Sequence, residues 1–229
     1  MQAARFTIVG LVFIAVFLQA QVPDLHPQQK FTPEPVVSFS LELPGAVPPY
    51  YSISVEGTGR AAYRASPVPG NIEGDPYILK FVLSQPARTR IFELAKKLHY
   101  FKGDFAYHKG RLANTGIKTL YFTDEKTNNS TTYNYSANPA VQELTRLFQN
   151  ISTTLEFGRR LQYYYDHQKL GLDDELKRMD QMAQEGELDE LQAVAPILQK
   201  IASDPQVMHI DQSHARHLLQ MAESGPRGR

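Results

Sequence analysis

Three histidines near the end of this 229-residue chain have a spacing that suits metal binding. In the segment "HIDQSHARH", His214 and His217 lie three residues apart, so a helix places them on one face, with His209 just upstream. Catalytic zinc helices instead pair histidines four residues apart around a glutamate, which is missing here. The segment therefore leaves two interpretations open: a weak zinc or nickel site, or a solvated helix face whose Asp211 is a helix N-cap.

A second group of titratable residues lies in the glycine-punctuated segment "HYFKGDFAYHKG". His99 or His108 near Asp104 would supply acid and base groups for a hydrolase acting on envelope material. The chain has no Gly-x-Ser-x-Gly, no Ser-x-x-Lys and no cysteine to serve as nucleophile. An enzyme is therefore the alternative, and no catalytic residue, cofactor or resident metal is assigned.

Aromatic side chains in the same segment suggest binding rather than catalysis. Exposed aromatic rings beside lysines are typical of glycan and peptide sites. The competing interpretation is that Phe101 and Phe105 close the base of the core. One tyrosine of residues 163–165 is added to the predicted binding residues. These three tyrosines cannot all face one side of a helix, so at least one should be exposed or contact a partner. The predicted ligand-binding or partner-binding residues are Tyr100, Phe105, Tyr107, His108 and Tyr164.

Two other motifs have simple structural explanations. The run Gly57-Thr58-Gly59-Arg60 resembles a phosphate loop, but a strand-like segment follows it where a phosphate loop needs a helix, so it predicts a hairpin turn. The acids of residues 173–190 have helical spacing and predict a solvated helix face. Four Asn-x-Ser/Thr sequons matter only in a host that glycosylates exported chains: Asn128, Asn129, Asn134 and Asn150.

The N-terminus predicts export. Arg5 precedes an apolar run from Phe6 to Leu18 and the small residue Ala20, which is the layout of a signal peptide over residues 1–20. The run is shorter than the roughly 20 residues that span a bilayer, so an uncleaved anchor is the minority interpretation. We expect a periplasmic or extracellular protein with no stable membrane insertion after cleavage. Without cysteine, it has no disulfide.

The formal net charge is zero, which disfavours nucleic acid as a partner. Alternating apolar residues predict strands at 36–43, 51–55, 61–65 and 77–83 and a hairpin within 117–135. Helical spacing after Ser84-x-Pro86 and Asn138-Pro139 predicts two helices, and the residues after 158 are helical throughout. We therefore predict an α+β fold: an antiparallel sheet with two helices packed on one face, followed by an all-helical C-terminal extension. The predicted parts are a signal peptide (1–20), a flexible leader (21–35), an α+β domain (36–157), a helical extension (158–224) and a disordered tail (225–229).

The order of these segments resembles a bacterial exported-domain family of unknown function. The matching segments are "SFSLEL", "YSISVEGTGRAAY", "IFELAKKLHYF", "IKTLYF" and "VQELTRLFQNI". Members of that family have a Cys-Phe-Gly-x-Cys-Pro segment between the first two strands, where this chain has "PGAVPPY". The resemblance implies the fold and an extracytoplasmic setting, and no activity. The leading hypothesis is a non-catalytic binding module of the cell envelope whose partner is another protein or an envelope ligand.

Overall fold

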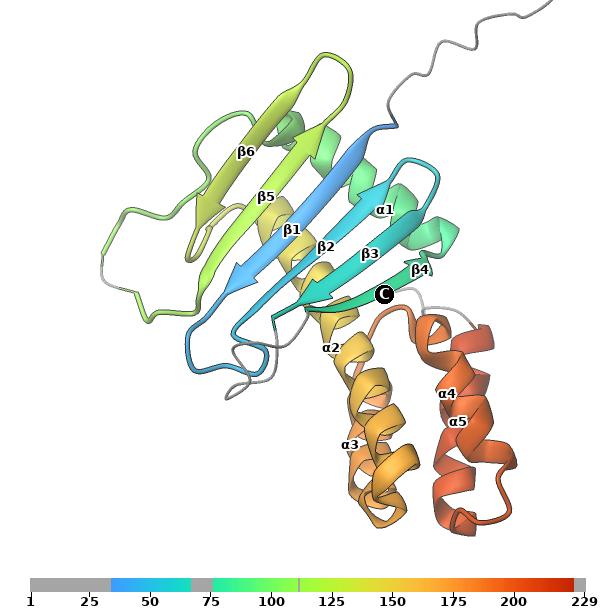
Figure 1. Cartoon of the computed structure of the whole chain (residues 1–229). Coiled ribbons are helices and arrows are strands. Elements are labelled where there is room, and N and C mark those ends of the chain that lie inside the picture. Colours follow the sequence, from blue (N-terminus) through green and yellow to red (C-terminus); the bar gives the residue numbers. More distant parts are fainter. Residues whose placement is uncertain (1–33, 67–75, 111, 225–229) are drawn as a thin grey trace, which may run out of the picture. The chain divides into compact units, whose positions relative to one another are not determined.

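The computed structural model describes residues 34–66, 76–110 and 112–224. The predicted signal peptide, nearly all of the leader and the C-terminal tail lie outside these residues. Within them the chain has a mixed α+β fold, as predicted, with one antiparallel sheet and five helices (Figure 1). No helix in these ranges is both long and apolar enough to cross a membrane.

The sheet has six strands in the order β4-β3-β2-β1-β5-β6, and every neighbouring pair is antiparallel. Its central strand is therefore the first one, which pairs on one side with the first hairpin and on the other with the second. The strands are β1 (Val36–Glu42), β2 (Tyr50–Glu56), β3 (Arg60–Ala65), β4 (Tyr77–Val82), β5 (Ile117–Thr123) and β6 (Asn128–Tyr133).

The turn at Gly57 to Gly59 is the hairpin turn that the sequence predicts. Gly59 has a φ of +91°, a region that side chains other than glycine rarely adopt. The Gly59 amide donates to the carbonyl of Glu56, and the Arg60 side chain pairs with the Glu56 carboxylate at 2.7 Å. The arginine beside the glycines is therefore bound within the hairpin, which accounts for the motif without a phosphate.

Two helices cover one face of the sheet, behind the strands in Figure 1. They are α1 (Gln85–Lys97) and α2 (Pro139–His167), and both begin as predicted. The Ser84 hydroxyl accepts from the Ala87 amide, and the Asn138 side chain accepts from the Ala140 amide. In each helix the N-cap side chain thus bonds one first-turn amide that has no partner within the helix. Apolar side chains of both helices and of the inner sheet face form the core, with Phe39 stacked on Phe148 at 5.3 Å between ring centroids.

The helical extension contains α3 (Leu172–Glu185), α4 (Ala195–Ser203) and α5 (His209–Ser224), with short 3-10 turns at 169–171 and 191–194. A further 3-10 turn at 99–101 follows α1. Helix α2 runs through residue 157 without a break, so it belongs to both the sheet part and the extension. Glu190 ties the extension to the start of α1, because its carboxylate accepts from both the amide and the hydroxyl of Ser84 at 2.7 Å.

One predicted cap is wrong. Helix α5 begins at His209, so Asp211 lies inside its first turn rather than at the N-cap. Its side chain is buried, and neither carboxylate oxygen has a hydrogen-bond partner by distance and angle. Burial and the neighbouring carboxylate of Asp173 raise the pKa of Asp211. The aspartate that the sequence assigns to solvent thus packs against the start of α3.

Candidate functional site

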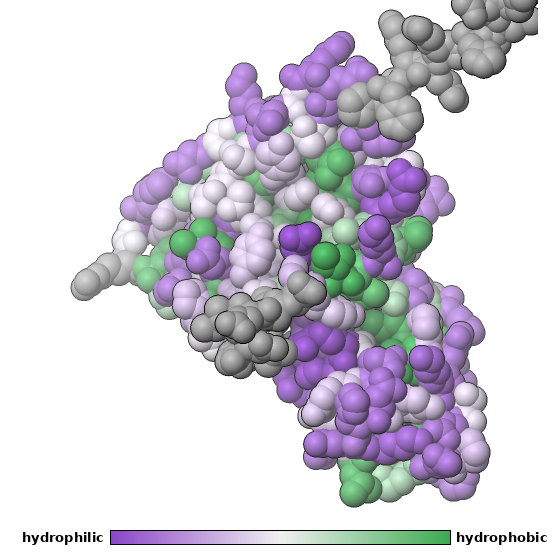
Figure 2. Space-filling model, viewed as in Figure 1, coloured by the Kyte–Doolittle hydropathy of each residue, from purple (hydrophilic) through white to green (hydrophobic). Residues whose placement is uncertain are grey.

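The sheet face that no helix covers offers little chemistry. Its central strands present Ser38, Ser40, Ser52, Ser54 and Ala62, which alternate with the core residues of the same strands. Figure 2 shows this face as a mixture of hydrophilic and weakly hydrophobic residues with small hydrophobic areas. Short hydroxyl side chains can contact a partner but supply no acid or base group. A pocket of about 480 Å³ on the β3 and β4 side of this face is lined by Ser54, Glu56, Arg60, Ala61, Ala62, Lys80, Phe81 and Val82.

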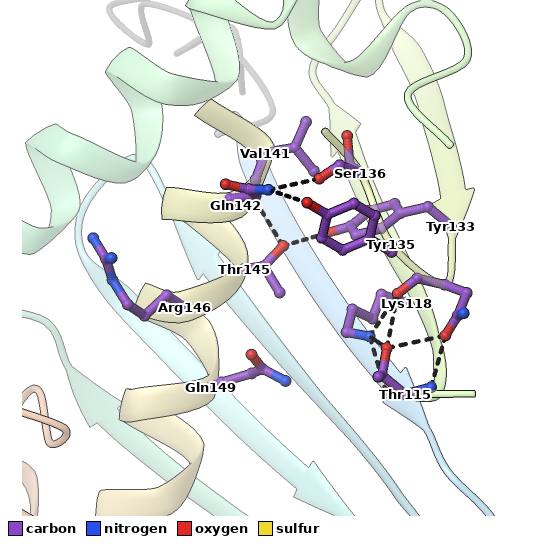
Figure 3. Close-up of a pocket in the computed structure, with 11 residues that line it drawn as sticks. Thr115, Lys118, Tyr133, Tyr135, Ser136, Val141, Gln142, Thr145, Arg146 and Gln149 are labelled. Carbon is purple, nitrogen blue, oxygen red and sulfur yellow. Dashed lines mark hydrogen bonds between the residues drawn. The ribbon is translucent and has the colours of Figure 1, made fainter. Parts of the chain in front are cut away.

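A pocket of about 240 Å³ lies between the second hairpin and the first half of α2 (Figure 3). We call it the Lys118 pocket, and it is lined by Thr115, Lys118, Tyr133, Asn134, Tyr135, Ser136, Val141, Gln142, Thr145, Arg146 and Gln149. Strand β5 supplies the lysine, the end of β6 and the turn after it supply the tyrosines, and α2 supplies the opposite wall. The lining contains two basic residues and no acid.

Lys118 is on the inner face of the sheet because it alternates with Thr119 and shares its face with Leu120 and Phe122. It is only 5% exposed. The lysine thus occupies a position in the core layer where an apolar residue is usual, next to the first residue of β5. Burial lowers the pKa of its ammonium group.

The partners of this ammonium group are all neutral. Its Nζ donates to the carbonyl of Asn134 at 2.8 Å, to the carbonyl and hydroxyl of Thr115 at 2.9 and 3.0 Å, and to the carbonyl of Gly116 at 3.3 Å. Within the described ranges no carboxylate forms an ion pair with it. Oxygen acceptors on all sides favour the charged form over a free amine, so Lys118 is a buried cation without a counter-ion.

The turn around Lys118 is held rigidly. Asn134 accepts from the Thr115 amide at 2.8 Å and donates to the Ala113 carbonyl at 2.8 Å. Gly116 has a φ of +92°, and an added Cβ would lie 2.6 Å from Leu41. The backbone oxygens that bind the lysine are thus positioned by neighbouring contacts rather than by the lysine alone, which preorganises this wall of the pocket.

The wall formed by α2 contains both engaged and free donors. The Gln142 amide donates to the Tyr135 hydroxyl at 2.9 Å and to the Ser136 carbonyl at 3.0 Å. Among the described residues, the side chains of Gln149 and Arg146 have no hydrogen-bond partner. Figure 3 shows Gln149 extending from α2 toward Lys118, and Arg146 extending along the outer side of the helix. The pocket therefore has an uncommitted amide inside, whereas the Arg146 guanidinium extends away from Lys118 and interacts with the carboxylates of Glu143 and Asp189.

Tyr133 closes the inner end of the pocket. Its hydroxyl is 2.5 Å from the Thr145 hydroxyl, which in turn donates to the Val141 carbonyl at 2.7 Å. Burial raises the pKa of Tyr133 to about 12, so the phenol stays neutral at physiological pH. This chain of hydroxyl groups positions the wall and supplies no base.

The aromatic residues predicted as a binding site do not gather into one. Tyr100 lies against Phe122, with 4.5 Å between ring centroids, and Phe105 packs partly buried against the core. Tyr107 does not line the Lys118 pocket but contacts one residue that does: its amide donates to the Tyr135 carbonyl at 2.9 Å, and the two rings meet edge to face. The competing prediction for this loop is confirmed: Phe101 is fully buried in the core.

The remaining predicted site residues are dispersed. His108 does meet Asp104, with Nε2 2.8 Å from the carboxylate, but their side chains are 71% and 65% exposed. His99 is also exposed, and Tyr164 lies far along the chain on α2, where its ring contacts Tyr163 at 5.8 Å. Neither the Lys118 pocket nor the pocket beside β3 and β4 contains a histidine. The acid and base pair on this loop is therefore a solvent-exposed contact.

In two of the sequons, the asparagine side-chain nitrogen to which a glycan would be attached already donates a hydrogen bond. The Asn134 Nδ2 donates to Ala113, and the Asn150 Nδ2 donates to the Asp189 carboxylate at 3.0 Å. A glycan at either position would have to break these contacts. The sequons at Asn128 and Asn129 lie at the start of β6, the edge strand of the sheet.

Sequence reasoning missed the Lys118 pocket. A signal was present, because "IKTLYF" places a lysine on the same face as a leucine and a phenylalanine. The other walls come from segments 15 to 31 residues away, and spacing alone does not predict their approach. No protein-family model matches the chain, and no curated protein matches it either.

Proposed function

We propose that this protein is a non-catalytic binding module of the cell envelope that holds a small carboxylate-bearing molecule in the Lys118 pocket. The observation that carries the proposal is the buried ammonium of Lys118, which has only neutral partners. Burying an unpaired charge costs several kcal/mol, and an anion that enters the pocket offsets part of that cost. A rigid turn that keeps the charge in place favours a binding role over a packing role.

The free donors support an anion of low charge. Gln149 has unused N–H groups on the wall that faces the lysine, and no acidic side chain lines the pocket. A carboxylate accepts hydrogen bonds from an amide, and its single negative charge matches the single buried cation. A volume of about 240 Å³ suits a molecule of a few heavy atoms or the carboxylate end of a larger one.

Binding is favoured over catalysis by what surrounds the pocket. The neutral oxygens that accept from Lys118 stabilise its ammonium form. An ammonium group has no lone pair, so Lys118 is a poor nucleophile. The Asp104 and His108 pair, which the hydrolase alternative requires, is exposed and does not line this pocket. The envelope setting rests on the N-terminal signal-peptide pattern.

Titration with sodium acetate at constant ionic strength, followed by backbone amide NMR, tests this function. We expect shifts that saturate at residues 115–118, 133–136 and 142–149. Lys118→Gln should weaken binding at least about tenfold, because it removes the buried positive charge that attracts the anion, and a loss of about 1.4 kcal/mol corresponds to a factor of ten. Binding should also weaken as the pH rises through the pKa of Lys118, since only the ammonium form attracts the anion.

Lys126→Gln is the matched control, because Lys126 is an exposed lysine in the turn of the same hairpin. It should leave the acetate affinity unchanged. Equal loss in both variants, or shifts spread over the whole surface, would show a nonspecific charge effect and would remove the basis for the proposed function. Inorganic phosphate in place of acetate distinguishes a carboxylate site from a general anion site.

A further inference from the structure

The histidines of α5 meet a buried acid of α3. The Nδ1 of His214 is 2.9 Å from one oxygen of the Asp180 carboxylate, and the Nδ1 of His217 is 2.6 Å from the other. Asp180 is 7% exposed, whereas the His214 and His217 side chains are 23% and 45% exposed. One buried carboxylate thus binds the inner nitrogen of two partly exposed imidazole rings.

This contact fixes the tautomer of both rings. The Asp180 carboxylate also accepts from the Gln184 side-chain amide at 3.2 Å, and an ionised carboxylate can only accept hydrogen bonds. Each Nδ1 must then carry the hydrogen, which leaves the lone pair of the neutral ring on Nε2. Neither Nε2 has a hydrogen-bond partner among the described residues, and neither is sealed from solvent.

A carboxylate behind an imidazole is the arrangement that metal-binding histidines use. The acid orients the ring and makes the outer nitrogen a better ligand. Two such rings three residues apart on one helix present two nitrogen ligands on one face of α5. His209, the third histidine of the predicted set, is exposed and is not bonded to Asp180.

We propose that His214 and His217 bind a divalent cation that prefers imidazole, such as Zn²⁺ or Ni²⁺, through their Nε2 atoms, with Asp180 as the carboxylate that positions both rings. Within residues 34–66, 76–110 and 112–224, no group of three ligating side chains is gathered for a metal. The protein therefore supplies two ligands, and water or a bound partner supplies the others. This is an open site, which suits metal exchange or recruitment better than a permanent structural role.

The neighbouring charges set limits on the affinity. Lys177 lies on the same face of α3 and pairs with Asp173 at 2.5 Å, and both interact with Asp211 near the first turn of α5. The acids attract a cation and the lysine opposes it.

Isothermal titration of the untagged protein with zinc chloride tests the site. We expect one ion per chain, and His214→Ala and His217→Ala should each abolish saturable binding. Asp180→Asn should weaken it about 10- to 100-fold, the usual effect of losing the carboxylate behind a ligating histidine. Nitrogen-15 NMR of the rings gives an independent readout, because zinc should shift the Nε2 signals of His214 and His217 while Nδ1 keeps its hydrogen.

His209→Ala is the control within the same helix, and it should bind zinc like the parent protein. Circular dichroism of each variant separates loss of the site from loss of the helix. The proposal is overturned if the parent binds no zinc, if His209→Ala loses as much affinity as His214→Ala, or if the Nε2 signals do not move.

Discussion

Replacing Glu156 by alanine is expected to lower the free energy of unfolding by about 3 kcal/mol. Glu156 is 5% exposed in the middle of α2, where its carboxylate accepts from the Tyr63 hydroxyl at 2.8 Å and from Arg159 at 2.6 and 2.9 Å. Alanine leaves a fully buried phenol and a half-covered guanidinium without their acceptor. Urea denaturation followed by circular dichroism measures the change.

Two further variants separate the contributions. Glu156→Gln keeps an oxygen for the Tyr63 hydroxyl but loses the charge that pairs with Arg159, so it should cost about 1 kcal/mol. Tyr63→Phe removes the phenol, and in that background Glu156→Ala should cost less than in the parent protein. Equal losses for the alanine and glutamine variants would show that the Tyr63 contact contributes nothing.

Gly158→Ala should destabilise the protein by about 2–3 kcal/mol, although alanine is the better helix former. An added Cβ would lie 2.4 Å from the Cγ1 of Val194, which is 3% exposed. Valine has few rotamers available, so the clash forces the 191–194 turn away from α2. Differential scanning calorimetry should show a lower Tm.

The double variant Gly158→Ala, Val194→Ala provides the check. Removing the two methyl groups of valine makes room for the new Cβ, so the double variant should be more stable than the sum of the single losses predicts. Strictly additive losses would mean that Gly158 has no role in the approach of the turn to α2.

The sequence predicts most elements of this fold because their signals are local. Ser84-x-Pro86 and Asn138-Pro139 mark the starts of two helices through the cap and the fixed φ of proline. Gly186 ends α3 in the left-handed conformation, as its position predicts. Each of these depends on residues within one turn of one another, which is the range over which spacing is informative.

Contacts between distant segments escaped prediction. The predicted boundary between the α+β domain and the extension falls just before Gly158, yet Gly158 lies inside α2. The side chain of Val194, 36 residues later, packs where a Cβ at position 158 would lie. Asp211 resembles an N-cap by type and position, but packing of α5 against α3 buries it. Lys118 looks like a surface lysine until the approach of α2 to the second hairpin closes the pocket around it.

The pKa of Lys118 tests the central claim most directly, because the proposed function depends on a buried ammonium that an anion stabilises. Carbon-13 NMR of labelled lysine side chains can follow this group with and without sodium acetate. In the free protein the pKa of Lys118 should lie below the ordinary value of a lysine side chain, since burial disfavours the charged form. Acetate binds the charged form, so it should raise the pKa of Lys118. A Lys118 pKa at the ordinary lysine value, or one that acetate does not move, would contradict the claim.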